Sequence, residues 1–95
     1  MVHHHTLHVL AHNQAGTLPR ILLAFARRRL CVQALHFYDL DPARPAELQI
    51  DLDCPTEVAQ ALTRELRSLE NVCQVHVENL QETTPGPLAT QVDAA

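Results

Sequence analysis

Aromatic residues are scarce in this 95-residue sequence: they make up 3% of the chain, and tryptophan is absent. The three that occur, Phe25, Phe37 and Tyr38, are too few for the stacking surfaces on which proteins bind single-stranded nucleic acids. The formal net charge of -4 points the same way, because binding to a phosphate backbone needs a basic surface. The arginine run at 27–29 is a local exception, which we expect to be a solvated face or a protein contact rather than a phosphate site. We predict no nucleic-acid partner.

Long apolar runs and paired cysteines are missing as well. No stretch approaches the roughly 18–20 apolar residues that span a bilayer, and the N-terminus lacks the charged and apolar regions of a signal peptide. The three cysteines, Cys31, Cys54 and Cys73, are widely spaced and form no Cys-x-x-Cys motif. That pattern favours free thiols in a reducing compartment over a disulfide framework. We therefore expect a cytoplasmic protein without membrane contact, in which Cys31 is a buried, unreactive thiol.

What the chain does contain is enough apolar sequence for one small domain. Hydrophobic residues make up 46% of the chain, and with few aromatics the core must be aliphatic. A domain of this size buries a modest share of its surface, so oligomerisation is a natural way to stabilise it.

Hydrophobic periodicity predicts the element order β-α-β-β-α-β, a ferredoxin-like α+β fold with a four-stranded antiparallel sheet and two helices on one face. We set residues 1–5, with His3-His4-His5, aside as an N-terminal extension or tag remnant, assign 6–79 to the domain, and expect 80–95 to be a flexible tail. The predicted elements are a strand at 6–12, a helix from 17 to 29 or 30, strands at 32–41 and 46–53, a helix from 55 to 70, and a strand at 72–77.

The turn at residues 13–18 is the best candidate for a site. Gly16 is one of two glycines in the chain, and glycine tolerates positive φ and close approach of a ligand. Thr17 is the expected N-cap of the following helix. The free N–H groups of a helix start suit a carboxylate or a phosphate. The alternative is a plain strand-to-helix turn that needs one glycine.

Catalytic and metal motifs are not apparent. The sequence has no P-loop, no dinucleotide fingerprint, and no nucleophile with a recognisable histidine and acid beside it. His8 and His12 share one face of a strand but lie about 13 Å apart, which is too far to share a metal ion. A polar sheet face is the favoured interpretation of these histidines, and of His36 and His76. We therefore expect a non-catalytic module that binds small molecules or proteins.

The turn and its surroundings resemble an ACT domain. More narrowly, the chain is similar to the short regulatory subunit of acetohydroxyacid synthase, also called acetolactate synthase, over about residues 7–79. We expect no further domain after the last strand, which would resemble the compact subunits of that family. The matching segments are Asn13-x-x-Gly16-x-Leu18, Leu23-Ala24-Phe25-Ala26-Arg27-Arg28, Val32-Gln33-Ala34-Leu35, and residues 62–77 from the second helix into the last strand.

This resemblance implies a function. Such subunits activate a large thiamine-diphosphate enzyme and often confer feedback inhibition by valine or another branched-chain amino acid. The chain itself would bind no cofactor, since thiamine diphosphate, magnesium and FAD are implied only on the partner. The domain would form a homodimer with the effector at its interface. The effector site implied by the family consists of Asn13, Gly16, Thr17 and Leu18 of one copy, with Cys31 and Val32 of the other.

Two positions depart from the family pattern. Valine-sensitive relatives carry Gly-x-Asn before the second strand, where this chain has Arg29 and Cys31. A thiol cannot replace the two donors and the acceptor of an asparagine amide. Loss of one polar partner costs about 1–3 kcal/mol of binding, so we expect activation to be kept and valine sensing to be weakened or lost. A free-standing ACT-type sensor without a synthase partner is the alternative, and a histidine-based metal binder is the least favoured interpretation.

Overall fold

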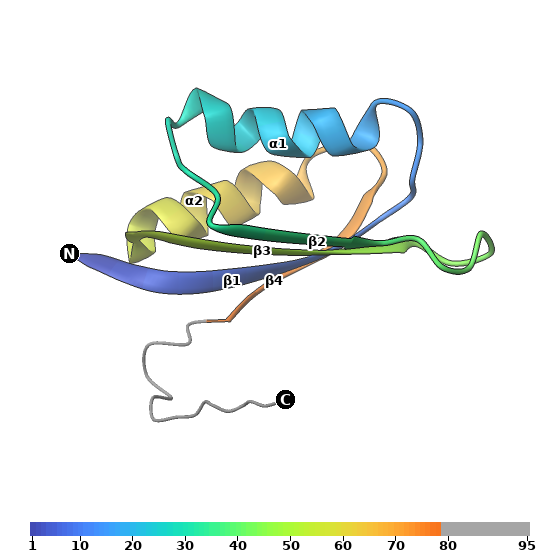
Figure 1. Cartoon of the computed structure of the whole chain (residues 1–95). Coiled ribbons are helices and arrows are strands. Elements are labelled where there is room, and N and C mark those ends of the chain that lie inside the picture. Colours follow the sequence, from blue (N-terminus) through green and yellow to red (C-terminus); the bar gives the residue numbers. More distant parts are fainter. Residues whose placement is uncertain (79–95) are drawn as a thin grey trace, which may run out of the picture.

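The computed structural model of the chain describes residues 1–78. The strands form one antiparallel sheet in the order β2-β3-β1-β4, and both helices lie on the same face of it (Figure 1). The predicted ferredoxin-like α+β fold is thereby confirmed; the tail assigned to 80–95 lies outside the described residues. The six elements are β1 (Val2–Ala11), α1 (Thr17–Arg27), β2 (Ala34–Tyr38), β3 (Ala46–Pro55), α2 (Thr56–Arg67) and β4 (Val72–Glu78).

The first strand begins earlier than the sequence predicts. β1 starts at Val2 and pairs with β3 over its whole length, so the histidines at 3–5 belong to the sheet. The boundary placed before residue 6 is therefore wrong. The physical reason is that β3 extends to Pro55, and its backbone N–H and C=O groups are paired by a first strand of equal length. β2 is shorter than predicted, because the backbone turns between α1 and Ala34 before it can join the ladder.

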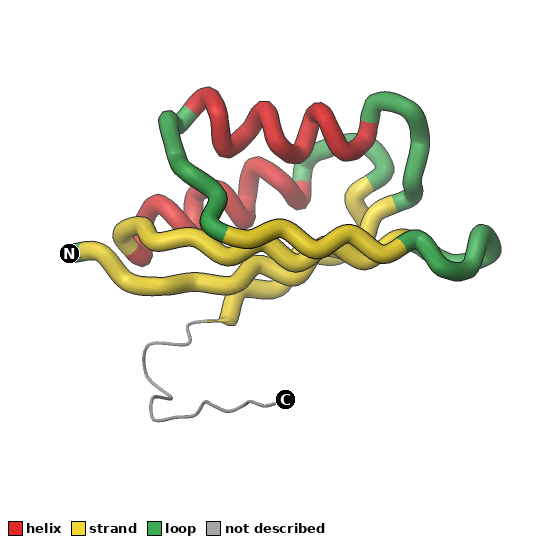
Figure 2. Tube along the Cα trace, viewed as in Figure 1, coloured by secondary structure: helices red, strands yellow, loops and turns green. Residues whose placement is uncertain are grey.

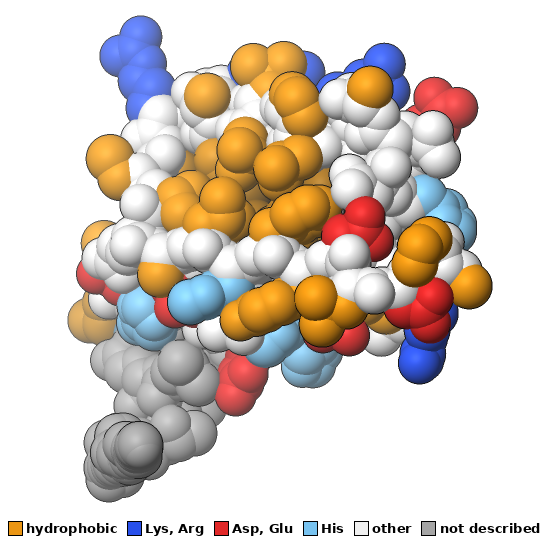
Figure 3. Space-filling view, turned by 45° about the vertical axis from the view of Figure 1, so that its right-hand side comes forward, with side chains coloured by type: hydrophobic (Ala, Val, Ile, Leu, Met, Phe, Trp, Pro, Cys, Tyr) orange, Lys and Arg blue, Asp and Glu red, His pale blue; other side chains and the backbone are white. Residues whose placement is uncertain are grey.

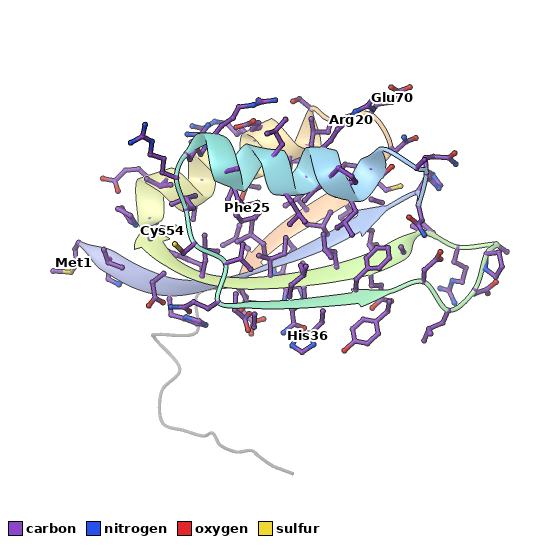
Figure 4. All side chains as sticks on the ribbon, turned by 45° about the horizontal axis from the view of Figure 1, so that its top comes forward. Met1, Arg20, Phe25, His36, Cys54 and Glu70 are labelled. Carbon is purple, nitrogen blue, oxygen red and sulfur yellow. The ribbon has the colours of Figure 1, made fainter. Side chains whose placement is uncertain are left out.

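The core lies between the sheet and the two helices. Phe25 of α1 points from the helix toward the sheet and is almost fully buried (Figure 4). On α2, Leu62 and Leu66 lie one helical turn apart and are completely buried, as the predicted apolar stripe requires. The sheet contributes the inward-facing side chains of three strands to this cluster: Leu7, Val9, Ala11, Leu48, Ile50, Leu52, Cys54 and Val75.

The arginine run after α1 contacts the protein itself. Arg27 and Arg28 donate hydrogen bonds to the two carboxylate oxygens of Glu65 on α2, at 3.1 and 3.0 Å. This joins the two helices at the surface, a contribution of about 1 kcal/mol or less for each exposed pair. The structure thus favours the protein contact predicted for these arginines over a phosphate site.

His5 is the one buried side chain among the described residues whose ring nitrogens both lack a hydrogen-bond partner. It is 1% exposed and lies on the helix-covered side of β1. Burial lowers the pKa of His5 below its ordinary value of 6.5, and the nearby His3 and His4 act in the same direction. The backbone of Cys54 and the carboxylate of Asp53 act against this shift. The folded protein therefore holds His5 neutral at a pH where the unfolded chain takes up a proton.

A pH dependence of stability follows from this burial. The folded-state pKa is lowered, so we expect the free energy of unfolding to fall as the pH drops below about 6.5, through the folded-state value. A His5→Leu variant should lose that part of the decline, whereas His12→Leu, at an exposed histidine outside the strand, should keep it. Urea unfolding between pH 8 and pH 5 measures both. Parallel pH profiles for the wild type and His5→Leu would contradict the assignment.

Candidate functional site

The loop between β1 and α1 is held together by Thr17. Its hydroxyl donates to the carbonyl of His12 at 2.9 Å and accepts from the N–H of Gln14 at 3.3 Å. The amide of Asn71, from the turn before β4, also donates to this hydroxyl at 3.4 Å. The predicted N-cap role of Thr17 is wrong, because Gly16 occupies the cap and no side chain caps the helix. The hydroxyl of Thr17 instead joins the two ends of the loop between β1 and α1 and links this loop to the turn before β4.

The start of α1 leaves few N–H groups for a ligand. The N–H of Thr17 donates to the carbonyl of Gln14 at 3.0 Å, and that of Arg20 to Gly16 at 3.2 Å. Pro19 has no N–H. Gly16 and Leu18 are therefore the backbone donors that the predicted site retains at this turn.

Gly16 is not required by the backbone conformation. Its φ is -98°, within reach of any residue, so the turn does not use the positive φ that glycine tolerates. A Cβ built there would lie 3.6 Å from the guanidinium carbon of Arg20, an ordinary contact. The Arg20 side chain therefore borders the turn and brings a positive charge to it, although it also lies 3.9 Å from Glu70.

Asp39 is a neighbour of this loop that the sequence analysis missed. The amide of Asn13 donates a hydrogen bond to the carboxylate of Asp39 at 2.7 Å. Asp39 directly follows β2, and β1 and β2 run in the same direction because both are antiparallel to β3. Their C-terminal ends consequently meet at one end of the sheet, where the loops after β1 and after β2 lie together (Figure 2). The predicted topology already implied that the loops after the first and second strands lie at the same end of the sheet.

Cys31 and Val32 lie at the other end of the molecule. They lie in the segment between α1 and β2, while Asn13 to Leu18 lie in the loop before α1 and in its first turn. The 11 residues of α1 span about 16 Å, so the two segments lie at opposite ends of this helix. Figure 2 shows the loops before and after α1 at its two ends. Within one chain the structure therefore brings Asn13, Gly16, Thr17 and Leu18 together but does not bring Cys31 and Val32 to them. Cys31 is exposed, so its predicted burial is wrong.

The backbone before β2 bears on Arg29, one of the two positions at which the sequence departs from the Gly-x-Asn pattern. Arg29 has φ = 57°, the left-handed region that favours glycine. The N–H groups of Arg29 and Leu30 donate to the carbonyls of Ala26 and Phe25, both at 3.0 Å, which closes the end of α1. The glycine of the Gly-x-Asn pattern would suit the same conformation. The presence of arginine in place of glycine therefore alters the side chain at position 29, while the backbone keeps a conformation that glycine also adopts.

The edge strand β2 carries apolar side chains that the helices leave uncovered. Leu35 and Phe37 point to the helix side of the sheet, opposite the buried Ile50 and Leu48, yet they are 40% and 39% exposed. Leu23 on α1 is 47% exposed. Figure 3 shows hydrophobic side chains gathered between α1 and this edge of the sheet. We call Leu23, Leu35 and Phe37, with the outer backbone edge of β2 that no strand of residues 1–78 pairs, the β2 edge surface.

The groups around the turn suit binding. They comprise the amide of Asn13, the carboxylate of Asp39, the guanidinium of Arg20 and two backbone N–H groups. The hydroxyl of Thr17 donates to a backbone carbonyl and not to a side-chain base. Neither helix of the described chain has the length and apolar character needed to cross a membrane.

No family model and no curated protein matches the sequence. Solved structures share its fold. The ACT domain of the GTP pyrophosphokinase of Chlorobium tepidum superposes with a TM-score of 0.71 at 11% identity, over 82% of this chain and 100% of that chain. The small subunit of acetolactate synthase from Thermotoga maritima superposes with a TM-score of 0.69 at 19% identity, over 78% of this chain and 46% of that chain.

A homoserine dehydrogenase from Thiobacillus denitrificans also superposes, with a TM-score of 0.68 at 14% identity, over 83% of this chain and 17% of that chain. At these identities the likeness establishes the fold alone. The chain has the ferredoxin-like fold of ACT domains, and it corresponds to less than half of the acetolactate synthase subunit it superposes on.

Proposed function

We propose that this chain is a non-catalytic regulatory subunit that activates the thiamine-diphosphate-dependent large subunit of acetohydroxyacid synthase. The ACT fold and the superposition on an acetolactate synthase small subunit support this proposal, as do the family motifs around Gly16. The three cysteines are free, in keeping with a cytoplasmic location. The observation that carries most weight is the loop of Asn13 and Asp39 at one end of an exposed apolar edge strand.

The geometry of β2 supports a homodimer with a shared effector site. If two copies pair their β2 strands antiparallel about a two-fold axis, the end of one β2 lies beside the start of the other. The Asn13–Asp39 loop of one copy then approaches Cys31 and Val32 of the second copy. This is the arrangement that the family resemblance implies. Among residues 1–78, β2 stands at the edge of the sheet and its outer side pairs with no strand.

The groups at this loop suit a zwitterionic amino acid. The N–H groups of Gly16 and Leu18 at the start of α1 would bind the α-carboxylate, with Arg20 nearby. The ammonium group would lie against the carboxylate of Asp39, which now accepts the bond from Asn13. The exposed apolar side chains of the β2 edge surface would contact a branched aliphatic side chain. Because Cys31 replaces an asparagine amide, we propose that binding of valine is weak.

A free-standing sensor domain is the second candidate. The same fold occurs in the ACT domain of a GTP pyrophosphokinase and in a homoserine dehydrogenase, so the fold does not select a synthase partner. As a free-standing sensor, the chain would bind an amino acid at the loop after β1 and would bind no large synthase subunit.

Reconstitution with the large synthase subunit of the same organism distinguishes the two candidates. We expect the two proteins to co-elute in size-exclusion chromatography, and the rate of acetolactate formation to rise when the chain is added. The chain alone should form no acetolactate. If the proteins elute separately and the rate stays unchanged, the subunit role is excluded and the free-standing sensor remains.

A further inference from the structure

The two edges of the sheet differ in the side chains that lie along them. β2 and β4 are the outer strands (Figure 1), and among residues 1–78 neither pairs with a further strand on its outer side. An unpaired edge offers backbone N–H and C=O groups to any extended chain, including a second copy of the same protein. The exposed apolar side chains of Leu35 and Phe37 flank β2. Along β4 lies Arg67 instead.

Arg67 contacts the backbone of β4 directly. It is the last residue of α2, and its Nη2 donates a hydrogen bond to the carbonyl oxygen of Val75 at 2.9 Å. Val75 lies in the middle of β4, and β1 occupies the inner side of that strand. Because the inner side is filled, the guanidinium reaches this carbonyl from the outer side. The depression along β4 is lined by Arg67 together with residues 72–76.

The guanidinium occupies the place that an added strand would take. Backbone hydrogen bonds between strands join nitrogen and oxygen at about 2.9–3.0 Å. The Arg67 nitrogen therefore lies where the backbone nitrogen of a fifth strand would lie, and the carbonyl of Val75 already has its donor. A fifth strand would have to displace this contact and would cover a positive charge that is exposed to water in the single chain.

The position of Arg67 matches the part of β4 that is regular. The register of β1 with β4 shifts between Leu10 and Ala11, opposite the start of β4, and such an irregularity interrupts pairing at an edge. The regular part of β4 runs from Gln74 to Glu78, and Val75 lies within it. Arg67 therefore obstructs the segment with which a second chain would have to pair.

Without Arg67, β4 would suit a second copy of itself. Three of its seven residues are valines, which favour strands. Antiparallel pairing of two β4 strands centred on Val75 would set Glu78 opposite Val72, and His76 opposite Gln74. No two like charges meet in this arrangement, so the strand itself does not oppose self-pairing.

We propose that Arg67 closes the β4 edge to a second copy of this chain and so leaves β2 as the edge at which copies pair. Antiparallel pairing at β2 about a two-fold axis makes a dimer whose two outer edges are both β4 strands. With both β4 edges closed, assembly stops at two copies; with both open, dimers would join edge to edge into longer rows. The limit at two copies rests on the homodimer proposed above, whereas the closure of β4 does not.

Arg67→Met tests the closure, because methionine keeps an unbranched apolar stem and has no N–H donor. In sedimentation equilibrium of the full chain we expect the wild type to stop at the dimer mass. Arg67→Met should reach at least about twice that mass at the highest concentrations, as dimers join through β4. The control Arg64→Met makes the same change at an exposed arginine one turn earlier on α2 and should behave as the wild type does.

A second background separates this inference from the proposed homodimer. Phe37→Asp alters the β2 edge surface, and the double variant Phe37→Asp/Arg67→Met should form a dimer through β4 where Phe37→Asp alone is monomeric. A wild type that is monomeric at all concentrations would contradict the β2 homodimer, and the closure of β4 then predicts a dimer for Arg67→Met. Hydrogen exchange should show that amides of β4 become protected on this association, while those of α1 do not change.

The closure of β4 is overturned by any of three results, with circular dichroism showing that the variants are folded. One is an Arg67→Met protein that keeps the wild-type mass at every concentration. Another is equal association of Arg64→Met, which would assign the effect to the lost positive charge and not to the strand edge. The third is association of Arg67→Met without protection of the β4 amides.

Discussion

Replacing Phe37 with aspartate is expected to convert a dimer of this chain into a monomer. Phe37 lies on the helix side of the edge strand β2, where it is 39% exposed in the single chain. Antiparallel pairing of two β2 strands would bury this ring beside Leu35 of the second copy. Aspartate removes the apolar contact and forces a carboxylate out of water. We expect the dimer dissociation constant to rise about a hundredfold or more, which corresponds to about 2.7 kcal/mol.

Sedimentation equilibrium over a range of concentrations measures this change. The control is Val2→Asp, which introduces the same charge at an exposed apolar residue of β1, an inner strand of the sheet. Circular dichroism should show that both variants keep the fold, because neither side chain belongs to the buried core. A Phe37→Asp protein that remains dimeric, or a wild type that is monomeric at all concentrations, would rule out this interface.

The fold could be predicted from the sequence because the apolar periods are clear. The stripe that includes Ile21 and Phe25 defines α1, and Leu62 with Leu66 defines α2; all four are buried as expected. The alternation in β3 likewise predicts its buried face. The start of β1 could not be predicted, since four of its first five residues, His3 to Thr6, are polar and give no alternation of apolar and polar residues. Their place in the sheet follows from pairing with β3, a long-range effect that local sequence does not encode.

The candidate site was predictable only in part. The motif around Gly16 locates the loop, but the hydroxyl of Thr17 bonds back to His12 and not forward to the helix. Asp39 and the pairing of His8 with His76 depend on strand order and register, which bring residues far apart in sequence together. The burial predicted for Cys31 failed because the backbone closes α1 at Arg29 and reaches β2 only at Ala34, leaving the thiol at the surface.

The second large effect is expected in effector binding. A variant that combines Arg29→Gly with Cys31→Asn introduces, before β2, the Gly-x-Asn pattern of the valine-sensitive subunits that the sequence resembles. Glycine suits the φ of 57° at position 29, and the asparagine amide supplies the donors and acceptor that a thiol lacks. We expect this variant to bind valine about ten- to a hundredfold more tightly than the wild type, from about 1–3 kcal/mol of regained polar contact.

Asn13→Ala should act in the opposite direction. It removes the amide that now bonds Asp39 at 2.7 Å, and we expect it to weaken binding about ten- to a hundredfold. Gln60→Ala, the loss of an exposed amide on α2, is the matched control and should leave the affinity unchanged.

Titration calorimetry of the purified chain with valine, leucine and isoleucine, without a large subunit, tests the central claim most directly. If the loop after β1 is an amino-acid site, the wild type gives weak saturable heat, the Arg29→Gly/Cys31→Asn variant tightens it, and Asn13→Ala weakens it. If neither the wild type nor the Arg29→Gly/Cys31→Asn variant gives heat at millimolar ligand, the loop does not sense these amino acids, and the claim is contradicted.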